Sequence, residues 1–252
     1  ALGIFKSEDE GETWNEWIDE SSGLTHPKVH DLSIDSENPD ILFAATEGGI
    51  FKSLDGGESW DVLYDETPIL QIEPSSNNPE IIYAVTAKNI IRTVDGGNNW
   101  ENVWQNDVTN PLSVLSLNTE PVFLYSGTVT GLLKSFDGGR NWVKDSDFSG
   151  TPVTAGYIYE NNLSHLLFGS GEKIFRSKDG GDTWQPLSPL IFGRNEGTSI
   201  THTLTHIETL GERTILAGTT SGLFVSKDQG RSWENINLSG AANQLSPSEM
   251  KM

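Results

Sequence analysis

Two groups of side chains in this sequence have the residue types that ligand-binding or acid–base chemistry requires. His26, His30 and Asp31 lie within one short stretch, and Arg194, Glu196 and His202 lie within another. Each group combines a carboxylate with imidazole, and the second group adds a guanidinium. Such mixtures are typical of small-molecule pockets when they gather at one end of a fold. We therefore predict that these six residues bind a ligand. The alternative interpretations are solvated surface positions for Arg194 and Glu196 and a structural use of the histidines.

Other candidate sites have too few ligands or lack the needed residue type. Asp145 and Asp147 flank Ser146 and could contact a hard cation, but Ca²⁺ prefers about six to eight oxygen ligands. The sequence contains no cysteine, which excludes a cysteine metal site and a disulfide framework. We predict no metal ion, no cofactor and no catalytic residue.

The charge of the chain restricts its partners. Thirty-six Asp and Glu residues against 16 Lys and Arg give a net charge of -20 over 252 residues. Binding to nucleic acid depends on clustered Lys and Arg, so a nucleic-acid partner is excluded. The acidic surface favours a location outside the cytoplasm, whether periplasmic, secreted or at the cell surface. No apolar run approaches the roughly 20 residues of a membrane-spanning helix.

Six copies of one eight-residue motif organise the chain, and we call each copy a repeat turn. Their starts lie 46, 40, 42, 42 and 49 residues apart, a period that fits one four-stranded propeller blade. The copies are SEDEGETW (7–14), SLDGGESW (53–60), TVDGGNNW (93–100), SFDGGRNW (135–142), SKDGGDTW (177–184) and SKDQGRSW (226–233).

Three places of the repeat turn have a structural explanation. The Asp at the third place can accept backbone N–H groups within the turn, and the Gly at the fifth place supplies a backbone conformation that a β-carbon would prevent. The Trp at the eighth place is expected to be buried between neighbouring sheets. The Asp and Trp pairs are Asp9 and Trp14, Asp55 and Trp60, Asp95 and Trp100, Asp137 and Trp142, Asp179 and Trp184, and Asp228 and Trp233. Trp17 and Trp104 fall outside the turns, and we expect them to pack on outer strands, a sugar-stacking role being the alternative.

The second repeat shows how a blade is built. Residues 29–35, 41–46, 50–53 and 60–64 are predicted strands, separated by turn residues such as Pro39 and Gly49. The sequence thus predicts an all-β fold, a β-propeller of four-stranded antiparallel blades with these turns. About five blades are complete, and half a blade precedes them at the N-terminus, so we expect six to seven blades in the intact ring. Residues 1–238 are predicted to form the single propeller domain and 239–252 a flexible tail.

The motif resembles the Asp-box, or BNR, repeat S-x-D-x-G-x-T-W of sialidases, sortilin-type receptors, xyloglucan-cleaving glycosidases and Ycf48-type photosystem assembly factors. The resemblance implies that catalytic residues, in a sialidase-like member, lie on the face opposite the turns, where the loops carrying the six candidate residues are also expected. It further implies that a sialidase has three substrate-binding arginines and an Arg-Ile-Pro segment. The sequence has no such segment, and four of its six arginines lie in or next to repeat turns, which argues against sialidase activity.

These observations favour a non-catalytic, extracytoplasmic propeller that serves as a protein-interaction, assembly or scaffold module. The expected partner is a protein, including one in a membrane or envelope complex. The alternative is a glycoside hydrolase-like or carbohydrate-binding propeller with its pocket on the face opposite the turns. If the chain is an enzyme, it is expected to be a glycosidase but not a sialidase. Propellers host many unrelated activities, so the fold alone does not choose between these functions.

Overall fold

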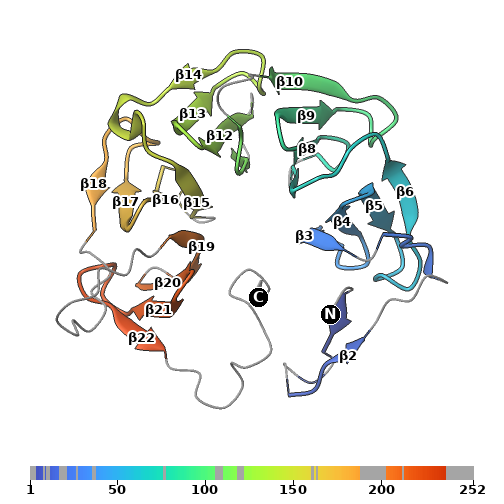
Figure 1. The fold of residues 1–252 in the computed structure, drawn as a ribbon, viewed down its shortest axis with the longest axis horizontal. Coiled ribbons are helices and arrows are strands. Elements are labelled where there is room, and N and C mark those ends of the chain that lie inside the picture. Colours follow the sequence, from blue (N-terminus) through green and yellow to red (C-terminus); the bar gives the residue numbers. More distant parts are fainter. Residues whose placement is uncertain are drawn as a thin grey trace. The chain divides into compact units, whose positions relative to one another are not determined.

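The computed structural model describes residues 4–7, 9, 12–16, 22–26, 28–35, 38–75, 78–105, 110–117, 122–159, 162, 164–187, 203–211 and 213–236. These residues form five four-stranded antiparallel sheets and one two-stranded sheet, which are the blades and half blade of an all-β propeller (Figure 1). The predicted fold class is therefore confirmed. Among the described residues no helix is long and apolar enough to cross a membrane. The predicted tail, 239–252, lies outside the described residues.

The chain divides into two compact units, Ala1–Leu124 with Ser135–Trp142 and Tyr125–Lys134 with Val143–Met252. The first unit contains the two-stranded sheet and the first two four-stranded sheets. Its strands are β1 (Phe5–Lys6), β2 (Asn15–Glu16), β3 (Val29–Ile34), β4 (Leu42–Thr46), β5 (Gly49–Ser53), β6 (Asp61–Tyr64), β7 (Gln71–Pro74), β8 (Ile82–Val85), β9 (Asn89–Thr93) and β10 (Glu101–Gln105).

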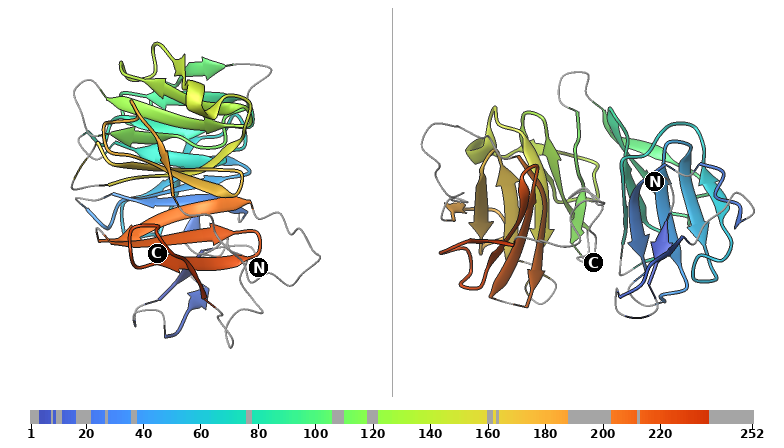
Figure 2. Two further views of the ribbon diagram at one scale, coloured as in Figure 1. Left: turned by 90° about the vertical axis from the view of Figure 1, so that its left-hand side faces the viewer. Right: turned by 60° about the horizontal axis from the view of Figure 1, so that its bottom comes forward.

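The boundary between the units runs through the third sheet, and the second unit contains the fourth and fifth sheets. The strands of these three sheets follow the order of the chain, as in the first unit (Figure 2). They are β11 (Leu115–Leu117), β12 (Phe123–Thr128), β13 (Gly131–Ser135), β14 (Val143–Lys144), β15 (Val153–Ile158), β16 (Leu166–Ser170), β17 (Lys173–Ser177), β18 (Gln185–Pro186), β19 (Leu204–Leu210), β20 (Thr214–Thr219), β21 (Gly222–Ser226) and β22 (Glu234–Ile236). A short 3-10 helix, η2 (Ser146–Phe148), follows β14.

The second strand of a sheet is buried on both faces. Every residue of β4, β8 and β16 is buried, which explains why these segments read as unbroken apolar runs rather than as alternating patterns. The first and fourth strands are only partly buried, for example β3 and β6. The core of each unit therefore lies along its second and third strands.

A threonine at the end of the second strand stabilises the hairpin that follows. The Thr46 hydroxyl donates to the Gly49 carbonyl at 3.1 Å and accepts the Gly48 N–H at 3.0 Å. Thr128 and Thr219 make the same bond to Gly131 and Gly222, each at 2.9 Å. The threonine hydroxyl therefore bonds the backbone of the turn at the end of the second strand.

Neighbouring sheets share apolar cores within each unit. In the first unit, Phe43 and Ile50 of the first sheet pack with Ile72, Ile82 and Ile91 of the second. In the second unit, residues of the fourth sheet such as Leu167 pack with Ile207 and Phe224 of the fifth. Burial of these side chains between sheets is the main favourable contribution to folding.

Candidate functional site

Each repeat turn is organised around its aspartate. In the second copy, the Asp55 Oδ1 atom accepts the Ser53 hydroxyl at 2.8 Å and the Ser59 backbone N–H at 2.9 Å. The Ser59 hydroxyl donates to the other carboxylate oxygen at 2.5 Å, and the Ser53 hydroxyl accepts the Gly57 N–H at 2.7 Å. Hydrogen bonds from the Ser59 hydroxyl, followed by its backbone N–H, lower the pKa of Asp55 to about 2. Both carboxylate oxygens of Asp55 therefore accept hydrogen bonds from residues of the turn itself.

The glycine at the fifth place allows the turn to approach the preceding sheet. Gly97 has a φ of +101°, and a β-carbon there would lie 2.4 Å from the Leu63 Cδ1 atom. The adjacent Trp100 ring packs on Tyr64 with ring centroids 5.4 Å apart, and its Nε1 atom donates to the Gly97 carbonyl at 3.1 Å. Trp100 also contacts the core shared by the first two sheets. Trp100 is therefore packed between neighbouring sheets, as predicted for the eighth place of the repeat turn.

The tryptophans of the first two repeat turns differ in burial. Trp60 is 4% exposed and packs against Ile4 and Leu24, which precede its sheet. Trp14 is 60% exposed, so the prediction that every repeat-turn tryptophan is buried is wrong for this residue. The physical reason is that Trp60 packs into a core with residues that come before its own sheet, whereas Trp14 belongs to none of the apolar clusters given above for the described residues.

Trp104 lies on the outer strand β10, as the sequence analysis predicted. Its ring packs edge-on against Trp142 with centroids 6.1 Å apart, within the core that also contains Tyr83 and Leu124. This packing supports the structural interpretation rather than a sugar-stacking surface. Trp17 lies outside the described residues.

Two of the predicted binding residues, His26 and His30, lie near one carboxylate. Both are exposed, and both contribute to lowering the pKa of Glu47, whose main stabilising partner is the hydrogen-bonded Lys28 ammonium. His30 occupies a β-bulge between Val29 and Asp31 in the pairing of β3 with β4. The His26 ring covers Gly48, where a β-carbon would be 2.2 Å from the ring. Both histidines therefore lie near Glu47 at the end of the first sheet, and a shared ligand-binding role for them stays a prediction.

Asp31 does not join them. Its side chain is 4% exposed, and its Oδ2 atom accepts the backbone N–H of Ile72 at 3.1 Å, while Oδ1 accepts the N–H of Leu32 at 2.8 Å. The carboxylate therefore connects the first strands of two neighbouring sheets, and a ligand-binding role for it stays a prediction. The other predicted residues, Arg194, Glu196 and His202, lie outside the described residues. In the described part of the chain, no three His, Asp or Glu side chains are arranged to hold a metal ion.

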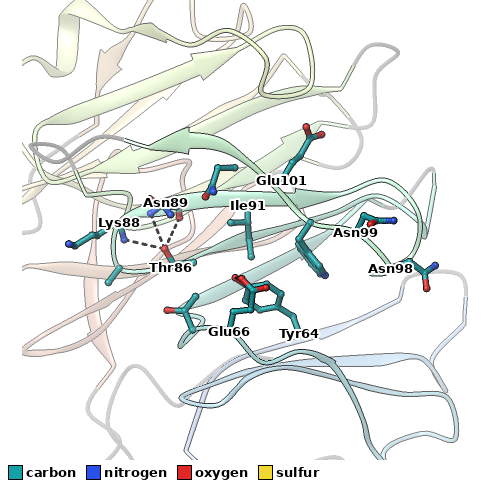
Figure 3. A pocket seen from close by; sticks show the side chains of 13 residues that line it. Tyr64, Glu66, Thr86, Lys88, Asn89, Ile91, Asn98, Asn99 and Glu101 are labelled. Atoms are coloured by element: carbon teal, nitrogen blue, oxygen red, sulfur yellow. Dashed lines mark hydrogen bonds between the residues drawn. The ribbon is translucent and has the colours of Figure 1, made fainter.

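A groove runs between the first and second sheets, and we call it the inter-sheet groove. It has a volume of about 690 Å³. Three segments line it, namely 64–67 at the end of β6, 86–91 in the β8–β9 hairpin, and 98–102 in the third repeat turn and the start of β10. Tyr64 and Glu66 lie along one side, and Ile91, Asn99 and Glu101 lie along the other (Figure 3).

The groove is rich in amide side chains and contains few unpaired charges. Asn89, Asn98, Asn99 and Asn102 all line it. Glu101 forms an ion pair with the buried Arg92, whose Nε atom donates to it at 3.1 Å. Such a surface offers hydrogen-bond donors and acceptors beside two half-buried aromatic rings, those of Tyr64 and Trp100.

A second surface feature is a set of exposed apolar side chains at the second place of three successive repeat turns, which we call the apolar row. Leu54 is 63% exposed, Val94 52% and Phe136 43%. Phe136 packs edge-on against Phe123, with centroids 5.1 Å apart. The fifth and sixth turns carry Lys178 and Lys227 at this place, so the row is confined to the turns of the first unit.

Comparison with known proteins supports the class of the fold. No protein-family model and no curated protein sequence matches the chain. An ancestral GH74 enzyme matches it with a TM-score of 0.69 and 20% identity over 93% of this chain and 36% of that one. The extracellular domain of a one-component system from B. thetaiotaomicron matches with a TM-score of 0.69 and 12% identity over 94% and 31%.

A third similar structure is Ycf48 from Cyanidioschyzon merolae, with a TM-score of 0.51 and 14% identity over 83% of this chain and 85% of that one. The chain spans about a third of the length of the first two structures. At these identities the similarity shows the fold alone, which is a β-propeller. The proteins that share this fold include an enzyme, the extracellular domain of a one-component system and Ycf48, so function must be argued from the surface of this chain.

The two surface features were missed by the sequence analysis for different reasons. The apolar row had a signal, because Leu54, Val94 and Phe136 occupy the one place of the repeat turn that is apolar in three successive copies and charged in the other three. The inter-sheet groove had none, since its three lining segments are brought together only by the packing of two sheets.

Proposed function

We propose that the chain is a non-catalytic, extracytoplasmic β-propeller module that binds a protein partner at the end of its sheets where the repeat turns lie. We also propose that these turns are Asp-box repeats, a proposal supported by the shared hydrogen bonding around each aspartate. The observation that carries the function is the apolar row. Leu54, Val94 and Phe136 are exposed at the same place of three successive repeat turns, so they offer one apolar contact per turn to a partner that lies along the turns.

Charge around the apolar row defines the chemistry of the partner. The second repeat turn is attached to Asp40, whose carbonyl accepts the Gly56 N–H at 2.8 Å, and the third is attached to Glu80, whose carbonyl accepts the Gly96 N–H at 3.0 Å. Both acidic side chains are exposed. A partner segment with apolar side chains flanked by Lys or Arg complements this surface, and electrostatic complementarity would speed its association.

The similarity to a GH74 enzyme suggests an enzymatic function as the alternative, but two arguments support a binding function instead. The match rests on 20% identity and covers 36% of the enzyme. The acidic and basic side chains that the described residues bring together, such as Lys134 with Asp145 and Arg92 with Glu101, are ion pairs that hold neighbouring elements. Lys134 also donates to the Gly181 carbonyl, which leaves it little capacity for a substrate.

Site-specific crosslinking tests the proposed function. Benzoylphenylalanine placed at Leu54 or Val94 in native cells is expected to crosslink one protein, and mass spectrometry should locate the crosslink in a basic segment with apolar residues. The same amino acid at Val62, which is 53% exposed on β6, is the matched control and should give no such product. The purified partner should then bind the wild type and lose at least about tenfold in affinity for the L54S/V94S/F136S variant, equivalent to about 1.4 kcal/mol. Equal affinity for the variant would contradict the proposal.

A further inference from the structure

We propose that the inter-sheet groove binds a neutral, hydroxyl-rich ligand of the saccharide class. This site is separate from the apolar row and does not depend on the proposed protein partner. It is carried by four observations on the first unit: the volume of the groove, its charge balance, its unused amide groups and its aromatic side chains.

The size of the groove fits a short oligosaccharide. Its volume of about 690 Å³ falls in the range of roughly 300 to 1,000 Å³ that is typical of small-molecule sites. The groove lies along two strands of one sheet and the end of a strand of the next, so its walls are held by backbone hydrogen bonds. A site on such rigid elements is formed before the ligand arrives, which lowers the entropic cost of binding.

The charge of the groove differs from that of the chain as a whole. Three charged side chains line it, Glu66, Lys88 and Glu101. Glu101 is neutralised by Arg92, which leaves one carboxylate and one ammonium. A chain with a net charge of -20 thus carries a groove with balanced charge. A phosphorylated ligand would need an excess of cations, and a basic peptide would need an excess of carboxylates, so the balance favours a neutral ligand.

The groove has hydrogen-bonding groups that the described residues do not use. Asn102 is exposed, and its side-chain amide makes no hydrogen bond within the described part of the chain, whereas its backbone belongs to the β9–β10 pairing. Asn98 and Asn99 each donate through Nδ2 to Asp95, which leaves their Oδ1 atoms as acceptors. Each amide offers a donor and an acceptor, and a sugar hydroxyl also has both. An amide beside a carboxylate and an ammonium is therefore suited to pairs of adjacent hydroxyl groups.

Aromatic side chains provide the apolar part of the site. Tyr64 and Trp100 line the groove beside Ile91, and both rings are half-buried. The C–H faces of a pyranose ring are apolar and pack against such rings, while the hydroxyl groups at the edge of the sugar reach the amides. A ligand with one apolar face and a polar edge matches this arrangement.

Binding of defined oligosaccharides tests the proposal. Cellotriose, mannotriose, maltotriose and chitotriose are titrated into the full chain and followed by calorimetry and by the side-chain amide signals of asparagine in NMR spectra. At least one is expected to bind and to shift the Asn102 signal. Asn102→Ala and Lys88→Ala should each weaken that binding by about tenfold.

The matched control is Asn235→Ala. Asn235 follows Trp233 and Glu234 as Asn102 follows Trp100 and Glu101, is also exposed, and lies on β22 in the second unit. This variant should bind like the wild type. The proposal is overturned if no oligosaccharide binds at millimolar concentration, if Asn102→Ala and Asn235→Ala bind alike, or if a Lys-rich peptide rather than a sugar shifts the Asn102 signal. The L54S/V94S/F136S variant should keep sugar binding, which separates this site from the protein-binding proposal.

Discussion

The buried carboxylate of Asp31 accepts the backbone N–H of Ile72, 41 residues further along the chain, at 3.1 Å. Similar bonds connect other first strands within a unit. The Gln71 side chain pairs with both backbone groups of Val114 at 2.7 and 3.0 Å, and the Thr154 hydroxyl donates to the Leu204 carbonyl at 2.6 Å. Polar side chains on the first strands therefore connect neighbouring sheets, in addition to the apolar cores between them.

Replacing Asp31 tests this connection. Asp31→Ala should lower the free energy of unfolding by about 1–3 kcal/mol, because it leaves the buried Ile72 N–H without its acceptor. Urea denaturation followed by tryptophan fluorescence measures the change. Asp61→Ala, at an exposed position of β6, is the control and should stay within about 0.5 kcal/mol of wild type. An unchanged stability in Asp31→Ala would show that the carboxylate has no structural role.

The tryptophans of the repeat turns are expected to differ in energetic importance. Trp60 is 4% exposed and Trp14 is 60% exposed. Trp60→Ala should cost about 3–5 kcal/mol because it removes a large buried ring, whereas Trp14→Ala should cost less than about 1 kcal/mol. Denaturation midpoints of both variants check this difference. Equal losses would mean that the Trp14 ring is as well packed as that of Trp60.

No glycosidase activity is expected. The sequence lacks the Arg-Ile-Pro segment that its resemblance to sialidases would require. Hydrolysis of other glycosides needs two available carboxylates about 5 to 10 Å apart across a cleft, and of the two carboxylates that line the inter-sheet groove, Glu66 and Glu101, the second is paired with Arg92. Nitrophenyl sialosides and glycosides should therefore release no nitrophenol with purified protein. Hydrolysis that disappears in Glu196→Gln would contradict this prediction and identify Glu196 as a catalytic residue.

The fold could be predicted because the repeat turn occurs six times in the sequence at the spacing of one propeller blade. The strands predicted at 29–35, 41–46, 50–53 and 60–64 are observed as β3 to β6 with ends that differ by about one residue. Each repeat turn fixes the end of a third strand and the start of a fourth, since its Asp side chain bonds the backbone of the turn and its Gly can adopt the positive φ that the turn requires. The exposure of Trp14 could not be predicted, because the contacts of a repeat-turn tryptophan come from the element before its own sheet.

The candidate site was less accessible to sequence reasoning. His26 and His30 both lie near enough to Glu47 to lower its pKa, because only a short stretch of chain separates them, but their predicted ligand-binding role stays a prediction. Asp31 is next to His30 in sequence, but its side chain is buried because it accepts the backbone N–H of Ile72 in the neighbouring sheet. The inter-sheet groove combines residues from two sheets, and no local pattern reports such a combination.

Gln229 is predicted to be a strained position. It has a φ of +62° and is the one non-glycine residue with a positive φ in the described part of the chain. Other repeat turns place glycine here, as at Gly56, Gly96 and Gly180. Gln229→Gly should raise the free energy of unfolding by about 0.5–1 kcal/mol, because release of the strain exceeds the entropic cost of glycine. Denaturation in urea measures the gain, and Gln185→Gly on β18 should instead be destabilising. A loss of stability in Gln229→Gly would show that the side chain makes a favourable contact.

Glu73 is expected to make the stability of the first unit depend on pH near neutrality. Its Oε1 atom accepts the Ser116 N–H at 3.1 Å and the Ser116 hydroxyl at 3.0 Å, but burial raises its pKa from 4.5 to about 7. A carboxyl whose pKa is raised on folding binds its proton more tightly in the folded state. Its contribution to stability is therefore fully present below about pH 4.5 and is lost as the pH rises through about 7.

Glu73→Gln removes this dependence. Relative to the wild type, the variant should gain roughly 3 kcal/mol in free energy of unfolding between pH 4.5 and pH 8, from about 1.4 kcal/mol for each pKa unit. The aspartates of the repeat turns do not interfere, since hydrogen bonds lower the pKa of Asp55 and Asp179 to about 2, and their effect on stability falls below pH 4 in both proteins. Urea denaturation at several pH values measures the difference, with the exposed Glu58→Gln as the control that should show no such trend. Parallel pH profiles for wild type and Glu73→Gln would mean that Glu73 ionises with an ordinary pKa.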